Sequence, residues 1–150
     1  MRPVKRRVMT LLLVILLLAT LAFIFSNSME SIPESREKSD GILALLTPFL
    51  EIFLGKGNVT EHLVRKLAHF VEFFVLGTEL SALCLLHQKP LLWAMFAGLL
   101  SALTDETIQI FYARGSQVQD VWLDFSAVLV TGILAFFCKK LRLMTQKDRP

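Results

Sequence analysis

The chain has 150 residues, of which 54% are hydrophobic, and its mean hydropathy is +0.57. A soluble domain of this length needs more polar surface, so the composition excludes an ordinary soluble domain and indicates one membrane domain over residues 1–150. The formal net charge is +3, and basic residues concentrate at both ends beside apolar segments, which favours membrane-orienting charges over a nucleic-acid-binding surface.

The first apolar segment, residues 8–25, contains no charged residue. A helix of this length can cross the hydrocarbon core of a bilayer, which is about 30 Å thick, so a transmembrane helix is predicted. A cleaved signal peptide is the alternative, because the chain starts with basic residues and Ser26 and Ser28 are small. The apolar stretch is longer than a usual signal core, which favours a retained helix.

A polar segment follows at residues 26–64, and it holds more acidic than basic residues. Residues 42–54 within it are apolar but too short to span a membrane, and Pro48 interrupts them. Apolar side chains recur there at helical spacing: Ile42, Leu45, Leu46, Phe49 and Phe53. This spacing predicts an interfacial helix lying on the bilayer, with a loop helix packed over the bundle as the alternative.

Three more apolar segments follow, at residues 67–86, 91–112 and 118–138. With the first segment they predict an all-α, multi-pass protein of the cell membrane with about four transmembrane helices. The distribution of Lys and Arg places both termini in the cytoplasm and residues 26–64 outside. Arg65, Lys66 and Arg114 oppose this count, because they lie on the acidic, extracytoplasmic side.

Polar residues gather near the extracytoplasmic ends of the last three segments. They are Arg65, Lys66, His69, Glu72, Asp105, Glu106, Gln109, Arg114, Asp120 and Asp124. With the predicted topology they reach one membrane level, and those of each segment share a helical face; the second face also includes Tyr112. Unpaired ionisable groups in a bilayer cost several kcal/mol, so we expect the acids to face the bundle interior and the bases to neutralise them.

This cluster has several interpretations. It could be an ion-pair network that locks helices together, although the number of titratable groups exceeds what helix association needs. A histidine among carboxylates could also bind a divalent metal or act in acid–base catalysis. No tight ligand spacing such as His-x-x-x-His is present, so a metal is not favoured. Glu79 lies about 15 Å deeper than His69 on the same face and could extend a proton path across the bilayer.

Three stretches of this region resemble the VanZ-like family of bacterial membrane proteins. Residues 65–73 read RKLAHFVEF, similar to the family's R-K-x-A-H-F-x-E-Y/F. Residues 105–111 read DETIQIF and match D-E-x-x-Q-x-F; Arg114 then precedes DVWLD at residues 120–124, where the family has an arginine, a spacer and D-V-x-x-N/D. Ala127 and Thr131 occupy positions where the family commonly has glycine, with Gly132 alongside, and both residues still allow close helix approach.

The resemblance implies a role in the cell envelope, in tolerance of teicoplanin-type lipoglycopeptide antibiotics. Teicoplanin carries an acyl chain that vancomycin lacks, so the partner could be the lipid-anchored drug, a membrane lipid or a lipid-linked envelope precursor. In a binding or shielding protein, Arg65, Lys66 and Arg114 would hold a phosphate or carboxylate head group.

The alternative is an outer-leaflet enzyme. His69 or Glu72 would be the base, and the four aspartates and glutamates of the last two segments would hold a divalent ion or orient groups: Asp105, Glu106, Asp120 and Asp124. No hydroxyl nucleophile in a recognisable setting accompanies them. The sequence leaves open whether the protein is an enzyme and which oligomeric state it adopts.

Overall fold

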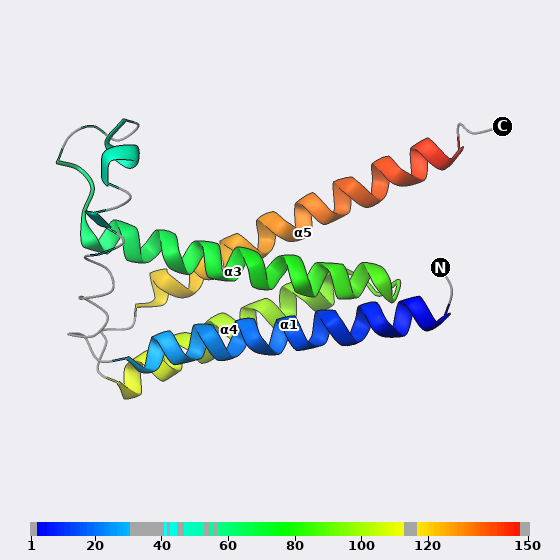
Figure 1. Ribbon diagram of the computed structural model, residues 1–150, viewed down its shortest axis with the longest axis horizontal. Coiled ribbons are helices and arrows are strands. Elements are labelled where there is room, and N and C mark those ends of the chain that lie inside the picture. The colour runs from blue at the N-terminus through cyan, green and yellow to red at the C-terminus, as the bar shows by residue number, and fades with distance from the viewer. Residues whose placement is uncertain are drawn as a thin grey trace.

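The computed structural model describes residues 3–30, 41, 43–44, 47–52, 55, 57–112 and 117–147. All regular secondary structure in these ranges is helical, which confirms the predicted all-α class. The long helices are α1 (Pro3–Met29), α3 (Glu61–Leu86), α4 (Leu92–Phe111) and α5 (Val118–Lys147). They form an elongated bundle in which α3 contacts each of the other three (Figure 1).

Three of these helices, α1, α3 and α5, are long and apolar enough to cross a membrane. Helix α4 has 20 residues, but its last turns contain Asp105, Glu106 and Gln109, which lower its hydropathy. These three side chains are buried in the bundle rather than turned outward. The structure therefore shows three candidate spans, and a fourth crossing by α4 stays a prediction.

The segment between α1 and α3 is described only in part. Residues 47–52 are helical, and Phe49 and Ile52 are exposed. Most of the apolar positions on which the interfacial helix was predicted lie outside the described residues, namely Ile42, Leu45, Leu46 and Phe53. Its placement on the bilayer surface stays a prediction.

Helix α1 continues to Met29, beyond residue 25 where the predicted membrane segment ends. Asn27 and Ser28 are therefore on a helix, not in a connecting loop. Helix α3 likewise begins before the predicted apolar segment, at Glu61, where the Thr60 side chain accepts a hydrogen bond from the Leu63 amide. This side-chain cap and an acidic residue in the first turn both stabilise a helix start.

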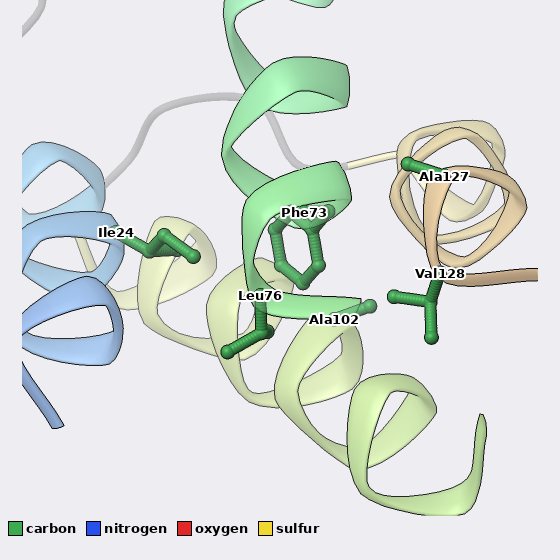
Figure 2. Close-up of a cluster of buried hydrophobic side chains, with 6 residues drawn as sticks. All are labelled: Ile24, Phe73, Leu76, Ala102, Ala127 and Val128. Atoms are coloured by element: carbon green, nitrogen blue, oxygen red, sulfur yellow. The ribbon is translucent and has the colours of Figure 1, made fainter. Parts of the chain in front are cut away.

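The core is small and lies where the four helices meet. It consists of Ile24, Phe73, Leu76, Ala102, Ala127 and Val128 (Figure 2). Close approach of α3 to α5 depends on Gly77, because a Cβ atom there would lie 2.9 Å from the Val128 Cα. Small residues at helix contacts are typical of membrane bundles, in which close packing replaces the hydrophobic effect between helices.

The start of α1 and the end of α5 lie at the same end of the bundle (Figure 1). At the opposite end, α1 and α4 finish while α3 and α5 begin; we call this the polar end. The C-terminal part of α5 extends away from the other helices and exposes apolar side chains such as Leu134, Phe137 and Leu141. Which side of the membrane the termini occupy stays a prediction.

Candidate functional site

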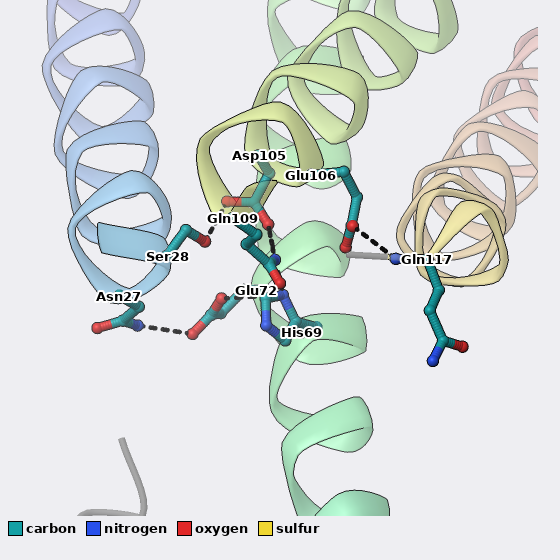
Figure 3. A network of polar contacts seen from close by, with 8 residues as sticks. All are labelled: Asn27, Ser28, His69, Glu72, Asp105, Glu106, Gln109 and Gln117. Atoms are coloured by element: carbon teal, nitrogen blue, oxygen red, sulfur yellow. Dashed lines mark hydrogen bonds and ion pairs between the residues drawn. The ribbon is translucent and has the colours of Figure 1, made fainter. Parts of the chain in front are cut away.

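The polar end brings together all the predicted site residues that the structure describes. Helix α3 supplies Arg65, Lys66, His69 and Glu72, α4 supplies Asp105, Glu106 and Gln109, and α5 supplies Asp120 and Asp124. Figure 3 shows part of this cluster seen from close by. Arg114, the remaining predicted residue, lies outside the described residues.

Asp105 is a buried carboxylate of the cluster that accepts a hydrogen bond on each of its oxygens. Its side chain is 0% exposed. The Ser28 hydroxyl of α1 donates to its Oδ1, and the Gln109 side-chain amide donates to its Oδ2 over 2.9 Å. Two donors, one to each oxygen, fix the orientation of this carboxylate, and a buried acceptor is costly to leave without partners.

His69 lies between two carboxylates. Its Nδ1 atom is 3.8 Å from the Asp105 Oδ2 and 4.0 Å from the Glu72 Oε2. The other oxygen of Glu72 accepts a hydrogen bond of 2.9 Å from the Asn27 amide of α1. An imidazole in this position can exchange a proton with a ligand, or it can coordinate a metal through a ring nitrogen.

Asp124 completes the interior side of the cluster. It is 1% exposed, and both of its carboxylate oxygens are buried without a hydrogen-bond partner among the described residues. One potential ligand atom from each of His69, Asp105 and Asp124 can be chosen so that all three lie within 4.8 Å of one another. Among the described residues, these three side chains are a group that could hold a metal ion.

The basic residues stand closer to the outside and pair differently. The Lys66 Nζ lies 3.0 Å from the Asp120 Oδ1 and so links α3 to α5. Arg65 pairs with Glu61 on its own helix, at 2.8 Å. Of the two described bases, Lys66 therefore neutralises an acid of the cluster as expected, whereas the Arg65 ion pair involves an acid outside it.

A polar pocket of about 120 Å³ opens at the centre of this arrangement. Besides His69, its walls carry three cationic or ionisable groups of α3 and three acids of α4 and α5: His62, Arg65, Lys66, Glu106, Asp120 and Asp124. His69, Gln109, Gln117 and Leu123 complete the lining. The Gln117 amide donates to the Glu106 Oε2 over 3.2 Å and ties the end of α4 to the start of α5. The volume suits a small polar group such as a phosphate with a few waters, and not a whole lipid.

Four contributors were not predicted from the sequence: Asn27, Ser28, His62 and Gln117. The run Ser26-Asn27-Ser28, directly after an apolar segment, was the available signal for the first two. One further helical turn carries them to the level of the acids. Tyr112, predicted to share a face with Asp105 and Gln109, is 49% exposed and is not among the residues that line the pocket.

Glu79 belongs to a separate polar contact deeper in the bundle. It is 4% exposed, and its Oε1 accepts a hydrogen bond of 2.9 Å from the Thr20 hydroxyl of α1. It is not among the residues that line the pocket.

One comparison with known proteins places this arrangement in a family. The sequence model of a family described as VanZ/LLP1 matches residues 11–139, which is most of the chain and includes every residue that lines the pocket. No curated protein and no solved structure matches the chain.

Proposed function

Since this chain belongs to the VanZ-like family and has helices long and apolar enough to cross a membrane, we propose that it binds or shields a lipid-anchored ligand at the outer leaflet of the bacterial envelope. The ligand is a membrane lipid, a lipid-linked envelope precursor or an acylated glycopeptide of the teicoplanin type. Its anchor stays in the bilayer while its polar head group enters the pocket at the polar end.

The observation that carries this proposal is the charge pattern of the pocket. Arg65 and Lys66 are half-buried where α3 forms the wall, while Glu106 and Asp124 are buried where α4 and α5 form it. Lys and Arg at a membrane surface hold phosphate or carboxylate groups by charge-assisted hydrogen bonds. The acidic wall is suited to a sugar hydroxyl or an amine of the same head group, so the pocket selects a ligand with both.

Such binding supports tolerance that is selective for teicoplanin. An acyl-anchored drug and a lipid-linked precursor share the outer leaflet with the pocket, whereas vancomycin has no acyl chain to hold it there. The protein would either sequester the drug or shield the precursor. In both cases the effect requires the pocket and a membrane-anchored partner.

The test is antibiotic susceptibility of a Gram-positive host that lacks resistance genes. Expression of the wild-type chain should raise the inhibitory concentration of teicoplanin at least 4-fold and leave that of vancomycin unchanged. His69→Ala, Asp105→Asn and Lys66→Gln should lose this protection. The matched control is Lys89→Gln, an exposed lysine in the turn between α3 and α4 at the opposite end of the bundle, which should protect as the wild type does.

Membrane levels and melting temperatures of each variant show whether a loss of protection reflects lost protein. If the wild type gives no protection, the tolerance proposal is wrong. If stable pocket variants protect as well as the wild type, the pocket is not the binding site and its charges serve to hold the helices together.

A second candidate function is catalysis on a lipid-linked substrate. The position of His69 between Glu72 and Asp105 favours it, because this is a suitable setting for a general base. The hydroxyls of Ser101, Thr104 and Thr107 each donate to the carbonyl four residues back on α4, so water is the better candidate for the nucleophile.

Proteoliposomes with lipid-linked phosphate substrates test this function. Turnover should be abolished by His69→Ala and retained by His87→Ala, a histidine that contacts Thr10 far from the pocket. Equal turnover in the two variants would contradict the assignment of His69 as the base.

A further inference from the structure

Asp124 raises a problem that the binding proposal does not solve. It lies within a membrane helix, it is 1% exposed, and neither carboxylate oxygen has a hydrogen-bond partner among the described residues. An isolated buried carboxylate is costly, and proteins pair such groups, protonate them or use them as metal ligands. Lys66, the described base nearest to the cluster acids, pairs with Asp120.

The surroundings of Asp124 contain the remaining parts of a metal site. One potential ligand atom each from His69, Asp105 and Asp124 lies within 4.8 Å of the others. Ligands bound tetrahedrally at about 2.1 Å from Zn²⁺ are about 3.4 Å apart. The His69 Nδ1 and Asp105 Oδ2 are already 3.8 Å apart, so small side-chain rotations would bring all three donors to a common ion.

The hydrogen bonds that neighbouring residues donate to this three-residue group are also typical of a metal site. Metal-binding carboxylates are usually held by hydrogen bonds from neighbouring residues, which fix their orientation. Ser28 and Gln109 hold Asp105 in this way from α1 and α4. The donors come from α3, α4 and α5, so an ion would join the three helices that form the pocket.

We propose that His69, Asp105 and Asp124 bind one divalent transition-metal ion, Zn²⁺ or Mn²⁺, on the interior side of the pocket. One imidazole and two carboxylates form a mixed nitrogen and oxygen donor set, which suits these ions better than Mg²⁺ or Ca²⁺, whose sites are built from oxygen alone. Three protein ligands leave at least one coordination position open. Because His69 and Asp124 line the pocket, the ion would lie at its wall. The inference goes beyond the proposed ligand binding and does not depend on it.

The experiment uses the full chain in lipid nanodiscs, stripped with a chelator and then exposed to Mn²⁺ or Zn²⁺ alone. Mass spectrometry of metals should find about one ion per chain, and the paramagnetic resonance signal of free Mn²⁺ should decrease as protein is added. Pulsed resonance spectra of the bound Mn²⁺ should show coupling to an imidazole nitrogen, and His69→Gln should remove that coupling. This measurement needs no ligand, so it can fail without affecting the binding proposal.

The matched pair of variants is Asp124→Asn and Asp120→Asn. Both change an acid of the α5 start that lines the pocket, but Asp120 is outside the three-residue group and pairs with Lys66. Asp124→Asn should weaken metal binding at least 10-fold, whereas Asp120→Asn should change it less than 3-fold.

Three results would overturn the inference. The first is a wild-type chain that takes up no ion at millimolar metal. The second is equal weakening by both α5 variants, which would mean diffuse attraction to acids. The third is bound Mn²⁺ without nitrogen coupling. If Asp124→Asn does not fold, the wild-type coupling and its loss in His69→Gln still decide the question.

Discussion

At the scale of single residues, Glu79 shows how this bundle accommodates an acid far from the polar end. It lies about 15 Å deeper than His69 along α3, and its Oε1 accepts a hydrogen bond from the Thr20 hydroxyl of α1. Its other carboxylate oxygen is buried without a hydrogen-bond partner among the described residues. Among the described residues, the Thr20 hydroxyl is therefore the side chain that donates a hydrogen bond to the Glu79 carboxylate.

Replacing Thr20 by Val should destabilise the protein by about 0.6 to 2 kcal/mol, because an interhelical hydrogen bond is lost and a buried acceptor is left without a donor. The difference in unfolding free energy between the wild type and the variant, measured by denaturation in mixed micelles, gives the size of this effect. Thr78→Val is the control, since the exposed Thr78 hydroxyl donates to the Phe74 carbonyl of its own helix. Equal losses from the two variants would show that the Thr20 contact contributes nothing specific.

Most of the site could be predicted at this scale, because helical periodicity and three segments with polar residues at one end determine which side chains converge. Asn27 and Ser28 could not. The end of a helix depends on partners for its last turn, and here those partners, Glu72 and Asp105, lie 45 and 77 residues further along the chain. The pairing of Arg65 with Glu61 on the same helix was missed because Glu61 lies before the predicted apolar segment and was counted as part of the connecting segment.

At the scale of the helices, the contact of α3 with α5 depends on small residues. A Cβ atom on Gly77 would meet the Thr131 hydroxyl and the Val128 backbone, whereas one on Gly132 would meet the Met95 Cε at 2.6 Å. The first obstacle includes main chain and cannot move without α5. The second is the end of a flexible side chain, which can rotate away.

Gly77→Ala should therefore lower the unfolding free energy by about 1–3 kcal/mol through overpacking. Gly132→Ala is the matched control and should be neutral or stabilising, since alanine gains up to about 1 kcal/mol in a helix over glycine. Melting temperatures of both variants in one detergent separate the two effects. A neutral Gly77→Ala would mean that α3 and α5 are not in close contact there.

The helices themselves were predictable because apolar runs of this length have few alternatives in a membrane protein. Their ends were less so: α3 begins at Glu61 and α5 continues to Lys147, through residues too polar to count as membrane segments. Side-chain caps and charges beside the helix ends determine these boundaries. The pattern of apolar residues carries no information about such caps and charges. Helical periodicity predicts which face of a helix is buried, but not which residues of that face form the core. The positions of Ala127 and Val128 in the core depend on how the helices pack.

At the scale of the whole molecule, the open question is the path of α4 through the membrane. Its acids are buried in the bundle, so its outward surface is mostly apolar although its last turns contain Asp105 and Glu106. We therefore expect helix α4 to cross the bilayer as a fourth span, and the distribution of Lys and Arg predicts that the polar end lies outside and both termini in the cytoplasm.

Single cysteines in a chain without Cys84 and Cys138 test this topology with a maleimide that cannot cross membranes. Gln117→Cys, at the polar end, should react in intact cells. Gln88→Cys, in the turn before α4, and Thr145→Cys, near the end of α5, should react only after permeabilisation. Reaction of Gln88→Cys and Gln117→Cys from the same side would show that α4 does not cross, and the reverse pattern at all three sites would show the opposite orientation.

The contacts of α1 also set an order for the protein's biogenesis. Its donors Thr20, Asn27 and Ser28 precede the acids that they bind by 59, 45 and 77 residues. At a synthesis rate of about 5–20 residues per second, Asp105 is made roughly 4–15 s after Ser28. These donors are uncharged, and the hydroxyls of Thr20 and Ser28 can donate to a carbonyl of their own helix until the acid is present. Each of these three acids leaves the ribosome after its donor is already in place.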